Sequence, residues 1–133
     1  MAAERLPPWL RHDGPPPGEG PGPDGPQPGE LYHVDTEILS RKDAHRDSWR
    51  PVVVVKVHTD LRLVRVYTRT SDLTEPGVRH PRDTALGLDK DGVFGKRWDQ
   101  SIDLGLFRYP LVIRRGMLDE GTFSKVLDMW EHG

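Results

Sequence analysis

The clearest pattern along the chain is a pair of apolar runs separated by a polar dipeptide. The first run, "RPVVVVKVH", covers residues 50–58, and the second, "LRLVRVYTRTS", covers residues 61–71. Both are rich in β-branched side chains, which favour strands. Thr59-Asp60 between them is typical of a turn. The two runs therefore predict a β-hairpin.

Side chains of the second run alternate between the two faces of the predicted strand. The alternation assigns to one face Arg62, Val64, Val66, Thr68 and Thr70, and to the other Leu63, Arg65, Tyr67 and Arg69. Because each face is partly apolar, the pattern favours a curled sheet over a flat sheet with one side in water.

Further strands are predicted before and after the hairpin. "ELYHVD" (30–35) alternates, while residues 72–92 are rich in Asp, Pro and Gly and predict loops with one short strand near Val78. "GVFGKRWDQSID" (92–103) and "YPLVIRRGM" (109–117) predict two more strands, the second with Pro110 at its start.

The last segment of the chain has the period of an amphipathic helix. Phe123, Val126, Leu127 and Trp130 lie at i, i+3, i+4 and i+7, and Asp119 suits the N-cap. Five or six short strands followed by one helix predict a mainly β fold, a small and strongly bent barrel with the helix packed on it.

The N-terminal part of the chain differs from the rest in its amino-acid composition. Residues 14–29 contain seven prolines and six glycines among sixteen positions, so they offer few side chains to bury and predict a flexible arm. We therefore expect an arm over residues 1–29 and a barrel domain over residues 30–133. Trp9 and Leu10 are either part of this tail or anchors that dock on the domain or on a partner.

Charge and composition narrow the function classes. The chain has no cysteine, so disulfides and thiolate metal sites are excluded. Its 19 Lys/Arg and 21 Asp/Glu leave a net charge of −2, all of it in residues 1–29, so a nucleic-acid site would have to be a local patch. No apolar run approaches the roughly 20 residues that cross a bilayer, and no signal-peptide stretch opens the sequence. A cytoplasmic location is expected.

Several familiar chemical motifs are missing from the sequence. It has no G-x-x-x-x-G-K-[ST] nucleotide loop and no G-x-S-x-G nucleophile elbow. Its six histidines form no i, i+4 pair, so no metal site is expected, and nothing in the sequence calls for a cofactor.

Polar groups at strand ends are the remaining candidates. Arg50 begins one predicted strand and Thr68, Thr70 and Ser71 end the next. Converging cations, hydroxyls and carboxylates suit metal-free phosphodiester cleavage, in which arginines stabilise the charge on phosphorus and acid–base groups move the protons. Arg97 and Asp99 share a face at i, i+2 and could join them, although such pairs are also common as surface ion pairs.

Five segments, taken in order, resemble the MazF/PemK (Kid) toxin family: "PGELYHVD", "RPVVVV", the strand that ends in "YTRTS", "GVFGKRWDQSID" and "MLDEGTFSKVLDMW". Members of that family open with a Pro/Arg-Gly-Asp/Glu-aromatic strand and continue with an Arg-Pro-valine strand, a strand that ends in Thr-Ser or Thr-Thr, an Asp-Gln segment and a C-terminal helix. The resemblance covers roughly residues 28–131, and it is carried by the order and spacing of the motifs together.

The resemblance implies an SH3-like barrel that forms a homodimer. It implies a toxin of a type II toxin–antitoxin system, which cuts single-stranded RNA without metal or cofactor, leaves 2′,3′-cyclic phosphate and 5′-OH ends, and is neutralised by a cognate antitoxin protein. The implied catalytic residues are Arg50, Thr68 or Thr70, Ser71, Arg97 and Asp99. The candidate RNA-binding residues are His45, Trp98 and Gln100. Trp98 could stack on a base, and a place in the core or at a dimer interface is the other reading of this residue.

The sequence departs from the family pattern at three places. Its first loop lacks a Gly-x-Glu-Gln segment, "SID" directly follows Asp99-Gln100, and the arm has no family counterpart. Two other readings stay open at this point. One is a catalytically inactive barrel that binds protein or RNA. The other is an adaptor whose proline-rich arm recruits a partner.

Overall fold

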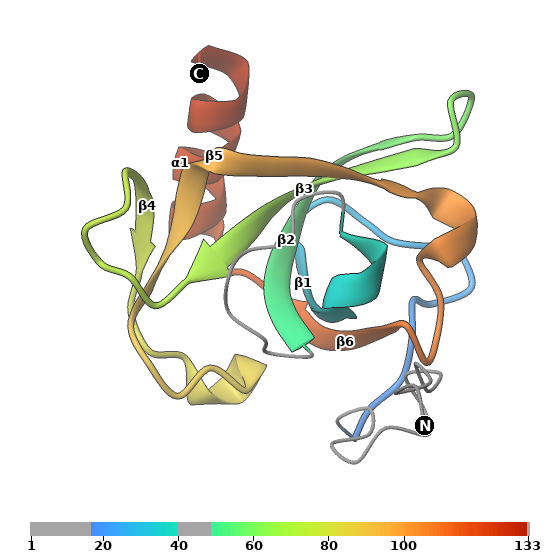
Figure 1. Cartoon of the computed structure of the whole chain (residues 1–133), viewed down its shortest axis with the longest axis horizontal. Helices are drawn as coiled ribbons and strands as arrows, with labels where there is room; N and C mark the ends of the chain where they lie inside the picture. The colour runs from blue at the N-terminus through green and yellow to red at the C-terminus, as the bar shows by residue number, and fades with distance from the viewer. Residues whose placement is uncertain (1–16, 40–48, 133) are drawn as a thin grey trace, which may run out of the picture.

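The structure is a computed structural model that describes residues 17–39 and 49–132. His45, Trp9 and Leu10 lie outside the described residues. The described chain forms one six-stranded antiparallel sheet in the order β4-β5-β3-β2-β1-β6, with a single α-helix against it (Figure 1). The elements are β1 (Glu30–Asp35), β2 (Trp49–His58), β3 (Leu63–Thr70), β4 (Gly77–His80), β5 (Gly92–Asp103), β6 (Val112–Met117) and α1 (Glu120–His132). The expected mainly β fold with a closing helix is confirmed.

The predicted hairpin is present as β2 and β3. Val57 pairs with Val64 and His58 with Leu63 beside the turn, and the register shifts after Val54, where β2 carries a bulge. Bulges increase the local twist of a strand pair, which helps a sheet to curl.

The curl buries both faces of the sheet. One core gathers Tyr32, Val34, Val52, Val54, Val64, Val66, Ile102, Phe107 and Val112 together with Leu39. The other core gathers Leu31, Val53, Val55, Tyr67, Leu86, Leu88, Phe94, Leu118 and Val126. Neighbouring valines in β2 therefore face opposite cores, which explains why "VVVV" has no polar residue in it.

Helix α1 begins as the sequence predicted. The Oδ2 atom of Asp119 accepts a hydrogen bond from the backbone N–H of Thr122 at 2.9 Å, which caps the first turn. Val126 is fully buried, and Phe123, Leu127 and Trp130 pack against the second core. Figure 1 shows α1 standing beside β4 at one end of the sheet. No described helix is long and apolar enough to span a membrane.

Two segments differ from expectation. Strand β6 begins at Val112 instead of Tyr109, because Leu111 and Val112 donate their backbone N–H groups to Arg108 in a preceding turn. Residues 17–29, expected to be part of a flexible arm, contact the sheet at both ends, and at one end the backbone N–H of Gly29 donates to Val54 at 2.8 Å. The backbone of Glu19 forms a bridge with Arg114 of β6, which gives an otherwise unpaired edge strand a partner.

Candidate anion-binding site

A pocket of about 250 Å³ opens at the end of the sheet where β2 begins and β3 ends. The two strands are antiparallel with Val52 opposite Thr68, so the start of β2 and the end of β3 lie at the same edge. The lining residues come from β1, β2, β3 and the loop before β5: His33, Trp49, Arg50, Pro51, Arg69, Ser71, Gly87, Leu88, Asp89 and Lys90.

The lining of this pocket is cationic. It contains Arg50, Arg69 and Lys90, and Asp89 is the one carboxylate among the described residues that line it. The barrel region as a whole has equal numbers of acidic and basic side chains. The positive charge is therefore concentrated here, and a concave site with that charge favours an anionic ligand.

Arg69 is a buried cation, with only 5% of its surface exposed. Its Nη2 donates to the backbone oxygens of His80 at 3.0 Å and Lys90 at 2.8 Å, and more weakly to that of Pro81 at 3.4 Å. Its Nε donates to Nδ1 of His80 at 3.1 Å. Burial lowers the pKa of Arg69, and the nearby acids Asp91, Asp83 and Asp89 oppose that shift. Arg69 thus fastens both ends of the 81–90 loop to β3.

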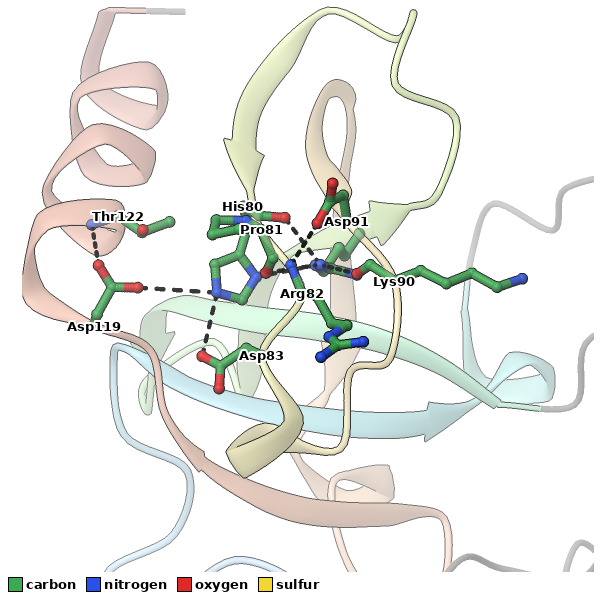
Figure 2. A network of polar contacts seen from close by, with 9 residues as sticks. His80, Pro81, Arg82, Asp83, Lys90, Asp91, Asp119 and Thr122 are labelled. Carbon is green, nitrogen blue, oxygen red and sulfur yellow. Dashed lines mark hydrogen bonds and ion pairs between the residues drawn. The ribbon is translucent and has the colours of Figure 1, made fainter.

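His80 continues this network toward the helix. Because its Nδ1 accepts from Arg69, the remaining proton of a neutral imidazole lies on Nε2. Nε2 is 3.5 Å from Oδ2 of Asp83 and 3.9 Å from Oδ1 of Asp119, the residue that caps α1 (Figure 2). Burial is the main cause that lowers the pKa of His80, Arg69 adds to the shift, and both carboxylates oppose it. The network therefore joins the pocket wall to the start of α1.

His33 is a pocket residue that the sequence did not single out. Its side chain comes from β1, opposite Pro51 of β2. Burial lowers the pKa of His33 to about 4, and the charges of Arg115 and Arg69 add to that shift. Its Nδ1 atom is buried and has no hydrogen-bond partner among the described residues.

Two of the predicted catalytic residues come together in this pocket. Arg50 and Ser71 both line it. Thr70 ends β3 directly before Ser71, and its Oγ1 accepts a hydrogen bond from the backbone of Asp72 at 3.1 Å, which shapes the turn. The placement of Arg50 at the mouth of the valine strand agrees with a site for an anion at the strand end.

Thr68 and Gln100 form a buried pair away from the solvent. Nε2 of Gln100 donates to Oγ1 of Thr68 at 2.9 Å, and each residue is only 3% exposed. A pair of this kind links β3 to β5 inside the first core. Neither residue lines the pocket among the described residues.

Thr68→Val is expected to lower the free energy of unfolding by about 1–3 kcal/mol, because it keeps the shape of the side chain but removes the acceptor of the buried Gln100 amide. Thr70→Val, at the more exposed end of the same strand, is the matched control and should cost clearly less. Urea unfolding followed by circular dichroism measures both. A Thr68→Val protein of unchanged stability that no longer cuts RNA would instead support a catalytic Thr68.

The structure does not bring Arg97 and Trp98 to the pocket. They lie in an irregular stretch of β5. Asp99 pairs with Tyr67 of β3, but the next pair along β3 joins Arg69 to Phe94, so residues 95–98 of β5 stand opposite Thr68 alone. Arg97 donates to Oε1 of Glu75 from Nε at 3.1 Å and from Nη2 at 2.9 Å, and Nε1 of Trp98 donates to the same oxygen at 3.1 Å.

Asp99 lies on the face of the second core. Its Oδ2 accepts from Nη2 of Arg65 at 3.3 Å, and the Arg65 guanidinium stacks over Trp130 of α1 at 4.8 Å. The alternation of β5 explains this placement, because Asp99 pairs with Tyr67 while Gln100 pairs with Val66 of the first core. The roles of Arg97 and Asp99 as acid and base stay predictions. Within the described residues, no group of three or more His, Asp or Glu side chains is arranged to hold a metal ion.

The fold that these elements define is the MazF fold. MazF of Deinococcus radiodurans (Form-I) superposes with a TM-score of 0.58 at 14% identity, over 81% of this chain and 94% of that chain. Two MazE–MazF structures from the same organism, Form-II and Form-III, give TM-scores of 0.57 and 0.55 at 14% identity, over 81% of this chain and 93% and 94% of theirs. No family model and no curated protein matches the chain. The SH3-like, MazF-type barrel expected from the resemblance is confirmed.

Proposed function

We propose that the chain is the toxin of a type II toxin–antitoxin system and cuts single-stranded RNA without a metal ion. The observation that carries the proposal is the cationic pocket in which Arg50 and Ser71 meet at the strand ends of a MazF-type barrel. The same fold in Deinococcus radiodurans belongs to a protein called MazF, which is also found in complex with MazE. An antitoxin of the MazE kind is accordingly the proposed partner, and a homodimer the proposed assembly.

The pocket chemistry fits transfer at a phosphodiester. Arg50 and the buried Arg69 would stabilise the negative charge that grows on the phosphoryl oxygens as a ribose 2′-OH attacks phosphorus. The O2′–P bond forms as the 2′-OH releases its proton to water, and the P–O5′ bond breaks as the 5′-oxygen takes a proton from water, so the products carry a 2′,3′-cyclic phosphate and a 5′-OH. The Ser71 hydroxyl can donate to a phosphate oxygen at the same site.

Arg97 and Trp98 are proposed to contact the RNA outside this pocket. The Arg97 side chain is 70% exposed although it is paired with Glu75, so it remains accessible to a flanking phosphate. Trp98 offers an aromatic surface next to it, and stacking on aromatic rings suits the bases of a single strand.

Arg50→Ala is expected to lower the rate of RNA cleavage at least about hundredfold, because charge stabilisation in the transition state is lost. The test is to induce the chain in a growing bacterium and to incubate the purified protein with end-labelled RNA in the presence of a chelator. Wild type should stop growth and leave cyclic phosphate ends, while Arg50→Ala should do neither and keep its circular dichroism spectrum.

Arg108→Ala is the matched control for this experiment, because Arg108 is exposed and lies outside the pocket lining. It should cut RNA at the wild-type rate. Wild type that binds RNA but cuts none would contradict the proposal and favour a catalytically inactive binding module of the same fold.

A further inference from the structure

His33 is placed to touch whatever anion enters the pocket. It lies on β1 between β2 and β6, where it pairs with Pro51 on one side and Ile113 on the other. Its imidazole lines the pocket together with Arg50 and Ser71. The side chain is half-buried, so only part of the ring is open to a ligand.

The two ring nitrogens of His33 differ in what surrounds them. Nδ1 is buried without a hydrogen-bond partner among the described residues, so Nε2 is the nitrogen left to face the pocket. Nδ1 is unsatisfied in either tautomer, but a buried N–H donor without an acceptor is rarer in proteins than a buried acceptor without a donor. The neutral ring therefore carries its proton on Nε2 and presents an N–H group to the pocket.

The charges around His33 keep it neutral. Arg69 from β3 and Arg115 from β6 both disfavour the imidazolium, and burial disfavours it more strongly. Arg50 and Lys90 line the same pocket, and Asp89 is the one carboxylate lining it among the described residues. With a pKa of about 4, His33 is uncharged from pH 5 upward.

We infer that His33 is a neutral hydrogen-bond donor to a phosphate oxygen of the ligand, through Nε2–H, and takes no part in proton transfer. The lone pair of this tautomer lies on the buried Nδ1, which a ribose 2′-OH cannot reach, so His33 cannot act as the general base. This inference rests on the proposed function for its substrate, a phosphodiester of single-stranded RNA. The anion site itself follows from the pocket alone.

Proton-detected nitrogen NMR of the histidine rings tests the tautomer directly. We expect His33 to show the Nε2–H form at pH 7 and to remain neutral down to about pH 5. Added inorganic phosphate should shift its Nε2–H resonance without protonating the ring. An Nδ1–H tautomer, or phosphate that shifts the other pocket resonances but leaves His33 unmoved, would overturn the inference.

Binding of a single-stranded deoxyoligonucleotide tests the contact between His33 and a phosphodiester. This ligand has no 2′-OH and is not cut. His33→Phe should weaken binding about tenfold, whereas His33→Gln, which keeps an N–H donor, should recover most of the loss. His58→Phe at the opposite end of β2 is the control and should bind as wild type does. Equal affinity of wild type and both His33 variants would contradict the contact.

The pH dependence of the same binding separates a neutral donor from a charged one. Phosphodiesters do not titrate between pH 5.5 and 8, so a neutral His33 predicts that wild type and His33→Gln respond to pH alike. If the imidazolium were the binding form, wild-type affinity alone would rise steeply as the pH falls. Failure of RNA cleavage with these binding results intact would reject the proposed nuclease activity and leave the His33 contact standing.

Discussion

Arg69→Leu is expected to lower the free energy of unfolding by about 3–5 kcal/mol, which is a large fraction of the stability of a small domain. Arg69 is only 5% exposed, and its guanidinium donates to His80 Nδ1 and to three backbone oxygens around the 81–90 loop. Each buried acceptor that loses its donor costs about 1–3 kcal/mol. The desolvation of the arginine cation, which the wild type bears, offsets part of this sum.

The loss of stability in Arg69→Leu should be largest in the 81–90 loop. Arg69 holds the carbonyls of Pro81 and Lys90, which stand at the two ends of that loop, and Gly92 lies directly against it. A Cβ atom at position 92 would come within 2.5 Å of Cζ of Arg69, so the buried guanidinium also requires glycine there. Amide hydrogen exchange should therefore accelerate in residues 81–92 more than in β1 or β2.

Urea unfolding at pH 7.5 and constant protein concentration measures the effect. Arg69→Lys should lose about half as much as Arg69→Leu, because an ammonium keeps the charge but cannot span both the Nε and Nη2 contacts. Arg79→Leu on the neighbouring strand β4 is the matched control, since that side chain is exposed and makes one weak contact, to Leu73 at 3.3 Å. Equal stabilities of Arg69→Leu and Arg79→Leu would show that the network does not stabilise the fold.

The strands and the helix were predictable because their signals are local. Period-2 and period-3.6 patterns need no knowledge of distant residues, and they placed the β2–β3 hairpin, β5 and α1 correctly. The apolar content of both faces of β3 also indicated the curl, which the two cores confirm.

The site was only partly predictable because it depends on long-range register. Alternation assigned Arg69 to the face of Tyr67, but it could not show that the loop around His80 folds over that cation. A charged residue on an apolar strand face is the signal that could have marked it. His33 had a similar signal, as a titratable residue in a strand whose neighbours are all buried.

The bulge in β5 is the feature that sequence could not reveal. Strict i, i+2 alternation predicted that Arg97 and Asp99 act from one face, yet Arg97 pairs with Glu75 and Asp99 with Arg65. Gly95 permits the irregular path, because a Cβ atom there would come within 2.3 Å of the Trp98 ring. Such local departures follow from packing of the whole strand, so alternation alone does not identify the partners of the side chains near them.

The second large effect is a loss of stability in mild acid. The pKa of His33 in the folded chain is lowered from 6.5 to about 4, and that of His80 is also lowered, in both cases mainly by burial. The unfolded chain therefore binds more protons than the folded chain between about pH 6.5 and 4. The free energy of unfolding must then decrease as the pH is lowered through that window. Above pH 7 both histidines are neutral in either state, so stability from this source is constant.

The size of this acid-induced loss of stability follows from the lowered pKa of His33. From pH 7.5 to pH 4, His33 alone should remove about 3 kcal/mol of the free energy of unfolding, and His80 should add to that loss. Urea unfolding at half-unit pH steps measures the slope. In His33→Phe the loss between these pH values should shrink by about 3 kcal/mol, because the variant has no proton to bind at that position.

His132→Gln is the control for the acid series, because its side chain at the end of α1 is 72% exposed and should keep the wild-type slope. Below pH 4 a separate loss begins, since the pKa of Asp119 is lowered chiefly by its hydrogen bond with the backbone of Thr122. Protonation of that carboxylate removes the cap of α1 and one of the two anionic partners of His80. A His33→Phe protein with the full wild-type acid slope would place the proton uptake elsewhere and contradict a neutral, buried His33.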